Sequence, residues 1–271
     1  WDDSLMDGSA PSATASGAAM LRAAHLLVDD EPKVFRDEWA VYFLDERRRL
    51  MAANREAMGT DITRASRSTV CARAMLTEHE VDAFVAEGGA QYVVLGAGYD
   101  SFALRRGDLA DRLTVFEVDH PSTQTAKRAR LAEGAVPEPS HVRFVPVNFE
   151  VGRLETELAK AGWRRDRPTF FSWLGVTMYL TDSATFATLE LVASCAKGSA
   201  IVFQYSVTGP TVQPGDLDIR DRASRGVAAA GEPWINFYDP PVLVGRLFAA
   251  GYASVEDLRA AELQPRFFGA R

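Results

Sequence analysis

The chain has 271 residues, of which 47% are hydrophobic and 25% charged, as is ordinary for a soluble globular protein. Its formal net charge of −7 argues against broad nucleic-acid binding, and no apolar stretch approaches the roughly 18 residues that a membrane span requires. The N-terminus lacks a basic segment followed by an apolar one, and Cys71 and Cys195 are too few for a disulfide framework, so we expect a cytoplasmic protein without membrane insertion.

The first part of the chain is predicted to be helical. Residues 8–19 are rich in Gly, Ala, Ser and Thr, as in a frayed terminus, and the apolar spacing that follows predicts a helix at 16–29. Further helices are expected at 36–54 and 68–87. Arginine is frequent here, and most of these arginines should form a solvated face. The four scattered histidines make no metal-binding motif, so we expect no metal site.

From residue 91 the pattern changes to strands that alternate with helices. This alternation predicts an α/β fold whose parallel sheet is covered on both faces. The expected strands are 91–95, 113–118, 142–147, 169–174 and 199–205, and the expected helices are 121–133, 151–161 and 183–196.

A long insertion, residues 207–240, then interrupts the alternation with many Pro, Gly and aromatic residues, and insertions of this kind are usually functional. We expect a helix at 240–250, a strand near 252–258 and a strand-like piece at 264–268 after it. No linker divides the chain, so we predict one domain over 1–271. Its parts are a helical cap (1–88), a core (89–206 and 241–271) and a substrate lid (207–240), with cap and lid folded over the strand ends where open sheets bind ligands.

The most informative segment is a glycine turn between two strands. Tyr92 to Leu95 form an apolar run typical of a buried parallel strand, and Gly96 and Gly98 follow where the chain must turn sharply. The next strand ends in Asp119, about 20 residues after the glycines, where an acidic side chain meets a ribose in dinucleotide-binding folds. The segment predicts a cofactor that contains adenosine.

The charge pattern of this turn favours S-adenosylmethionine over NAD. The dinucleotide fingerprint needs a third glycine, but Ser101 occupies that place. A pyrophosphate rests on exposed N–H donors at a helix N-terminus, whereas Asp100 puts a carboxylate in the same turn. S-adenosylmethionine carries a sulfonium amino acid and no phosphate, which suits these residues better.

Seven motifs along the chain carry a family resemblance. They are Ala72-Arg73, VVLGAGYDS at 93–101, FEVDHP at 116–121 with Lys127 downstream, VRFVPVNF at 142–149, FFSWLGVTMYLT at 170–181, GEPW at 231–234 and RFFGAR at 266–271. Together they resemble the class I S-adenosylmethionine-dependent methyltransferases of the leucine carboxyl methyltransferase-like group, and also actinobacterial O-methyltransferases of polyketide and other secondary metabolism. The resemblance implies a Rossmann-like, doubly wound, mostly parallel seven-stranded sheet with an antiparallel last strand.

The resemblance also implies roles for the cofactor-binding residues. Arg73 matches the arginine that pairs with the methionine carboxylate, a task for which the guanidinium fork is suited. The turn beside the methionine moiety is made by Gly96, Ala97 and Gly98, and Asp119 matches the ribose-binding carboxylate. Glu117 lies two residues earlier, inside the strand, where it should not reach the ligand.

Four further positions are less determined. Asn148 and Phe149 match an aspartate and an apolar residue beside the adenine ring, although Asn148 could equally cap the strand end. Leu174, assigned to the cofactor site, replaces the glutamate of leucine carboxyl methyltransferases, which puts their protein substrate in doubt. His120 is the candidate general base, because a hydroxyl acceptor must lose a proton. Its alternative role is a turn residue before Pro121 that packs near the adenosine.

For the methyl acceptor the sequence offers three aromatic residues, namely Tyr179, Trp234 and Tyr238, since aromatic side chains grip flat or apolar ligands. We expect an O-methyltransferase acting on a hydroxyl or carboxylate of a small molecule, such as a polyketide-like or other secondary metabolite. The alternatives are protein C-terminal carboxyl methylation and a non-catalytic cofactor-binding protein. An NAD-dependent reductase is disfavoured, since the third glycine and a Tyr-x-x-x-Lys pair are missing.

Overall fold

A parallel sheet of five strands in the order β3-β2-β1-β4-β5 forms the centre of the computed structural model, which describes residues 12–210, 212–229 and 231–269. The predicted parallel α/β sheet is therefore confirmed. The strand order reverses between β1 and β4, and ligands bind at such a switch point, outside the carboxyl ends of the strands. The strands are β1 (Gln91–Leu95), β2 (Thr114–Asp119), β3 (Val142–Pro146), β4 (Phe170–Trp173) and β5 (Ala200–Phe203).

The central strands of the sheet are buried on both faces. β1 is buried along its whole length, and alternate residues enter different hydrophobic clusters: Val93 and Leu95 in one, Tyr92 and Val94 in the other. Helices α8 (Leu154–Lys160), α9 (Asp182–Ala193) and α11 (Pro240–Ala250) supply apolar side chains to the first cluster, and α5 (Asp61–Ala86) and α6 (Phe102–Arg105) to the second. Helix α7 (Pro121–Glu133) follows β2.

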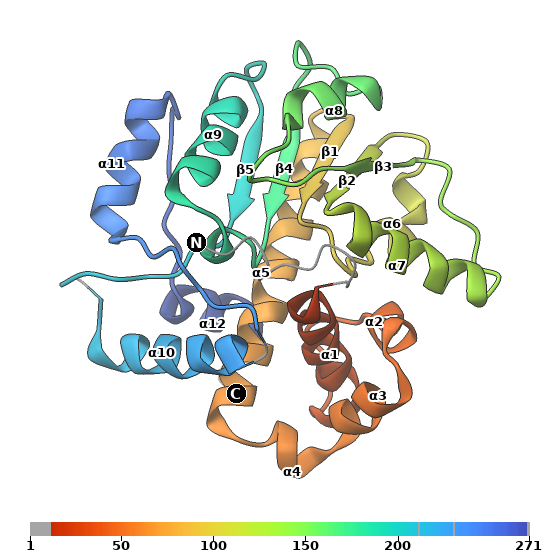
Figure 1. Ribbon diagram of the computed structural model, residues 1–271, viewed down its shortest axis with the longest axis vertical. Coiled ribbons are helices and arrows are strands. Elements are labelled where there is room, and N and C mark those ends of the chain that lie inside the picture. The colour runs from red at the N-terminus through yellow and green to blue at the C-terminus, as the bar shows by residue number, and fades with distance from the viewer. Residues whose placement is uncertain (1–11, 211, 230, 270–271) are drawn as a thin grey trace.

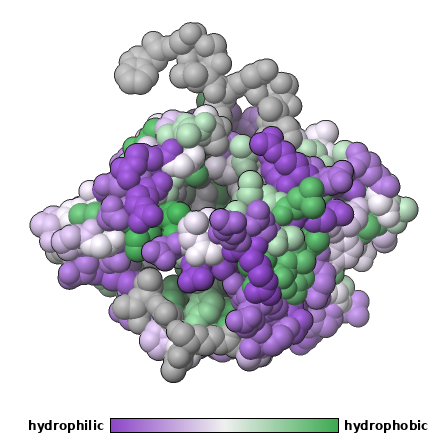
Figure 2. Space-filling model, turned by 90° about the horizontal axis from the view of Figure 1, so that it is seen from below, coloured by the Kyte–Doolittle hydropathy of each residue, from purple (hydrophilic) through white to green (hydrophobic). Residues whose placement is uncertain are grey.

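A helical layer lies beyond the carboxyl ends of the strands. Figure 1 shows the arrowheads of β4 and β5 pointing toward α1, α10 and the lower part of α5. On the outer side of this layer, hydrophilic residues surround recessed hydrophobic ones (Figure 2). The helices of the layer are α1 (Ala13–Val28), α2 (Glu38–Phe43), α3 (Glu46–Ala53), α4 (Arg55–Met58) and α10 (Pro214–Ala229), the last from the 207–240 insertion.

Side-chain caps explain where this layer differs from the prediction. The helix expected at 36–54 is divided, because the Asp45 carboxylate accepts the N–H of Arg48 and starts α3. Similarly, Ser12 caps α1, so residues 13–19 are helical rather than frayed, while 8–11 lie outside the described residues.

The two strands predicted after the insertion are not found. Residues 252–258 form no strand, and 264–268 belong to α12 (Ala260–Phe268). A capping box explains the helix, because the Glu262 carboxylate accepts the N–H of Arg259 and fixes the first turn. The described residues thus form five strands rather than seven, without an antiparallel last strand. Among them no helix has the length and apolarity to cross a membrane.

Candidate functional site

The glycine turn joins β1 to α6 at the switch point. Gly96 and Gly98 have φ values of +67° and +50°, which glycine adopts without strain. A Cβ added at Gly96 would lie 2.3 Å from Cγ2 of Val176, in the segment after β4. The turn is therefore both left-handed and tightly packed, and Ala97 between the glycines is buried.

Asp119, the last residue of β2, holds the turn from one side. One carboxylate oxygen accepts the N–H of Gly98 at 2.5 Å, and the other accepts the N–H of His120 at 2.6 Å. Burial raises the pKa of this carboxyl, while the two N–H donors act in the opposite direction. Each oxygen keeps a further lone pair with which it can accept from a ligand hydroxyl.

The neighbouring acid, Glu117, is already paired. Its carboxylate lies 2.5 Å from Nζ of Lys127, and the same ammonium donates to the carbonyl of Asp100 at 2.7 Å. Both members of the pair are buried. The Glu117–Lys127 pair therefore holds the glycine turn through the Asp100 carbonyl. Asp119 is the acid at the end of β2 that does not take part in this pair.

Arg73, on α5, lies on the other side of the turn. Its guanidinium donates to the side-chain oxygen of Gln204 and packs against Gly175, where an added Cβ would lie 2.9 Å from Nη1. Burial, reinforced by the nearby Arg22, lowers the pKa of Arg73 to about 10. None of the residues that the structure describes pairs a carboxylate with Arg73. A half-buried cation without a carboxylate partner is unfavourable, so the position suits an anionic ligand group.

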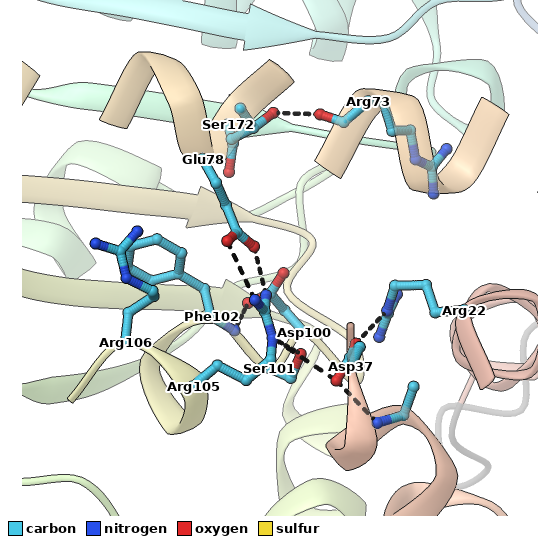
Figure 3. Close-up of polar contacts among 12 residues, drawn as sticks. Arg22, Asp37, Arg73, Glu78, Asp100, Ser101, Phe102, Arg105, Arg106 and Ser172 are labelled. Carbon is cyan, nitrogen blue, oxygen red and sulfur yellow. Dashed lines mark hydrogen bonds and ion pairs between the residues drawn. The ribbon is translucent and has the colours of Figure 1, made fainter. Parts of the chain in front are cut away.

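A buried polar network ties the turn to the helical layer (Figure 3). Arg22 donates to the Tyr99 carbonyl at 2.6 Å and to the Asp37 carboxylate at 2.7 Å. Asp37 is 0% exposed and also lies 3.7 Å from Nε of Arg105. Arg105 in turn donates to Glu78 of α5. Helices α1, α2, α5 and α6 thus meet around one side of the turn.

His120 caps the helix that follows it. Its Nδ1 accepts the N–H of Ser122 at 3.4 Å and lies 2.8 Å from Oγ of Ser122, at the N-terminus of α7. Pro121 takes the first helical position, where a missing N–H does no harm. One ring nitrogen is thereby engaged in a structural contact, and a role in proton transfer stays a prediction.

The residues assigned to the adenine lie at the ends of β3 and β4. Asn148 is exposed, and its side-chain oxygen accepts the N–H of Glu150 at 3.0 Å, as a turn cap does. The ring of Phe149 packs on Trp173 with centroids 5.8 Å apart, and Leu174 directly follows Trp173. Their contact with adenine stays a prediction.

Two of the three acceptor candidates lie together. Burial raises the pKa of the Tyr179 hydroxyl. Its neighbours Trp234 and Thr14 and the positive charge of Arg73 act in the opposite direction. The indole N–H of Trp234 is buried, and no described residue accepts it in good geometry. Tyr238 lies apart, in the hydrophobic cluster under α9 and α11, where its hydroxyl donates to Asp182 at 3.1 Å.

Sequence reasoning did not single out several residues at this site, among them Arg22, Gly175, Gln204 and Glu232. Gly175 and Gln204 could have been suspected, since each stands just beyond the carboxyl end of a strand, where α/β sheets place ligand contacts. Arg22 carries no local signal, because its role depends on Asp37 and Tyr99, which are remote in sequence.

A cavity of about 660 Å³ lies elsewhere, between α1, α4, α5 and α12, and none of the predicted site residues lines it. Within the described ranges, no group of three or more His, Cys, Asp and Glu residues could hold a metal ion. The chemistry that the sequence predicts therefore depends on the strand-end site rather than on this cavity.

Solved structures support the fold. A methyltransferase-like protein from Thermobifida fusca is 16% identical, covers 98% of this chain and 94% of its own, and superposes with a TM-score of 0.53. A DUF574 family protein from Streptomyces avermitilis is 15% identical, with 82% and 80% of the two chains covered and a TM-score of 0.51. At this identity the likeness concerns the fold alone.

Sequence relatives point to the family. A Bacillus subtilis protein, provisionally described as an S-adenosyl-L-methionine-dependent methyltransferase, is 32% identical over 75% of this chain and 67% of its own length. A Mycolicibacterium paratuberculosis protein with the same description is 30% identical over 86% and 74%. Several mycobacterial relatives are matched over only 47% of their length.

Residues 15–193 match the leucine carboxyl methyltransferase family. This match covers more than half of the chain and includes the glycine turn, Arg73 and Asp119. The chain therefore belongs to the leucine carboxyl methyltransferase family of class I methyltransferases, whose cofactor is S-adenosyl-L-methionine.

Proposed function

We propose that this protein is an O-methyltransferase that transfers the methyl group of S-adenosylmethionine to a hydroxyl or carboxylate of a small molecule. A polyketide-like or other secondary metabolite fits the motifs best. The single observation that carries the proposal is the guanidinium of Arg73, which is half-buried beside the glycine turn and has no carboxylate partner among the described residues.

The residues present fit this cofactor at both ends. β1 lies between β2 and β4, so Asp119 flanks the glycine turn on one side and Arg73, packed against Gly175, on the other. Arg73 would hold the methionine carboxylate, which would relieve its lack of a partner. Asp119 would accept from the ribose hydroxyls, and Asn148, Phe149 and Leu174 would meet the adenine. The bound cofactor would supply an electrophilic methyl group on a sulfonium.

The chain contributes mainly position to such a transfer. In-line displacement requires the acceptor oxygen about 3 Å from the methyl carbon, and holding it there supplies much of the rate. Tyr179 lies near both Arg73 and Trp234, and the two aromatic side chains would contact the acceptor. The buried indole N–H of Trp234 could donate to one of the acceptor's oxygens. A carboxylate acceptor needs no base, whereas a hydroxyl must lose its proton, for which His120 is the candidate.

Calorimetric titration with S-adenosylhomocysteine, the product of transfer, tests the site. We expect micromolar binding to the wild type and loss of at least 100-fold in affinity for Arg73→Ala and Asp119→Ala, since each removes a charge-assisted contact. Arg64→Ala is the matched control, because Arg64 is an exposed arginine on the same helix and should not matter. Binding of NADH in place of S-adenosylhomocysteine would contradict the proposal.

An acceptor screen then separates the activities. Transfer to small phenols, alcohols or carboxylic acids supports the proposal, and transfer only to a protein C-terminus favours the carboxyl methyltransferase alternative. Leu174 stands against that alternative, because it replaces the glutamate of enzymes with a protein substrate. Cofactor binding without turnover on any acceptor would indicate a non-catalytic protein.

A further inference from the structure

Glu232 connects the 207–240 insertion to the first turn of α1. One of its carboxylate oxygens accepts the N–H of Ala13 at 2.9 Å, and the other accepts the N–H of Thr14 at 3.0 Å and the Ser12 hydroxyl at 3.4 Å. The first N–H groups of a helix have no partner within the helix, and its N-terminus carries a partial positive charge. Glu232, remote in sequence, therefore satisfies two of these N–H groups and adds a negative charge at the helix end, while the Ser12 hydroxyl accepts the N–H of Ala15.

The first turn of α1 lies directly on the glycine turn. A Cβ added at Gly98 would lie 3.0 Å from Cβ of Ala15, so the two backbones are in close contact. One residue earlier, Thr14 lies beside the hydroxyl of Tyr179. The first turn thus covers the glycine turn and adjoins the proposed acceptor side.

The rest of α1 is held differently. Arg22 is fixed by Asp37 and the Tyr99 carbonyl, and the alanines of this helix at positions 19, 23 and 24 are fully buried. Glu232, in contrast, is only partly buried and comes from a separate segment of the chain. The N-terminal end of α1 therefore depends on a partly exposed contact, whereas the middle of the helix is held by buried residues.

We propose that Glu232 is a positioning residue that latches the first turn of α1 over the glycine turn and so retains the cofactor. This inference rests on the proposed cofactor site. Trp234 lies two residues further along, so the segment that holds the latch also carries an acceptor contact. Cofactor exchange then requires the latch to open, and opening displaces the acceptor side at the same time.

The test measures the dissociation rate of S-adenosylhomocysteine by stopped-flow displacement. Glu232→Ala should raise this rate about 10-fold, because loss of a charged helix cap should increase the population with an open first turn by about that factor. Glu232→Gln, which keeps the size and one accepting oxygen, should raise it less. Glu262→Ala is the matched control, because Glu262 also accepts a backbone N–H at a helix start, but on α12. Its dissociation rate should equal that of the wild type.

Hydrogen exchange separates a latch from general loosening of the fold. In Glu232→Ala, exchange should accelerate for the amides of residues 13–17 and remain unchanged for residues 21–28. Unchanged dissociation and exchange in Glu232→Ala, or equal acceleration in Glu262→Ala, would overturn the latch and leave the cofactor site standing. A wild type that binds no S-adenosylhomocysteine would overturn both.

Discussion

Helix α1 meets the glycine turn at two places that differ in kind. In its middle, Arg22 bonds to Tyr99 of the turn and to Asp37, whose carboxylate is 0% exposed. At its first turn, Ala15 merely touches Gly98, and the helix end is held by the partly exposed Glu232. One helix thus contacts the glycine turn both through a polar network around the fully buried Asp37 and through an end that depends on a partly exposed side chain.

Electrostatics distinguishes the two contacts further. Burial acts to raise the pKa of Asp37, but Arg22 and Arg105 outweigh it and hold the pKa below its usual value. The stabilisation is therefore fully present above the ordinary pKa of aspartate and is lost as the pH falls through the lowered value. At neutral pH the network in the middle of α1 is at full strength.

The largest effect is expected at that network. Asp37→Ala removes the carboxylate between two buried guanidinium groups and should lower the free energy of unfolding by about 3–5 kcal/mol, measured by urea denaturation. Asp45→Ala is the control, because Asp45 also caps a helix beside an arginine but is exposed, so it should lose only about 1 kcal/mol. Equal losses in the two variants would show that burial of the network does not matter.

A smaller effect is expected where the first turn of α1 rests on the glycines. Gly98→Ala should destabilise the fold by about 1–2 kcal/mol because of its positive φ, and its new Cβ should also press on Ala15 and weaken S-adenosylhomocysteine binding. Gly88→Ala has the same left-handed strain but open space around it. Comparable urea midpoints with a binding defect in Gly98→Ala alone would show that the contact with Ala15 affects the cofactor site, whereas normal binding in both variants would contradict this.

The smallest effect at neutral pH is expected for the protonation of Asp119, which also contacts the glycine turn. Burial raises the pKa of this carboxyl above 3.8 in the free protein, and only the ionised form accepts fully from ribose hydroxyls. Affinity for S-adenosylhomocysteine should be constant above that pKa and fall by up to about tenfold per unit as the pH drops below it. In Asp119→Asn, the affinity measured by calorimetry should not change with pH. If it falls at low pH as much as in the wild type, Asp119 is not the cause of the pH dependence.

The sequence predicts the central strands well because burial dictates them. β1 and β2 consist of apolar runs that end in informative residues, Gly96 and Asp119, and both strands were found within one residue of their predicted limits. The strand predicted at 264–268 is wrong because the paired aromatic residues of QPRFF suit a strand or a helix equally, and only the Arg259–Glu262 capping box decides.

The sequence alone points to candidate site residues where they lie at or directly after the end of a strand, as Asp119 and Gly96 do. Arg73 is assigned only through its motif, because its helix gives no local reason to separate it from the other arginines. Arg22 and Glu232 could not be found, because each contacts partners that are distant along the chain. Such contacts depend on how α1 packs against the glycine turn and the 207–240 insertion, and the apolar periodicity of the helix does not predict that packing.

The segment after β4 has a consequence for changing the acceptor by directed evolution. The side chain of Val176 occupies the space that Gly96 leaves open, and the guanidinium of Arg73 occupies the space at Gly175. Substitutions at Val176 should therefore disturb the glycine turn, and substitutions at Gly175 should displace Arg73, both parts of the proposed cofactor site. A library aimed at new substrates should keep Gly175 and Val176 constant and diversify Tyr179 and Trp234 instead.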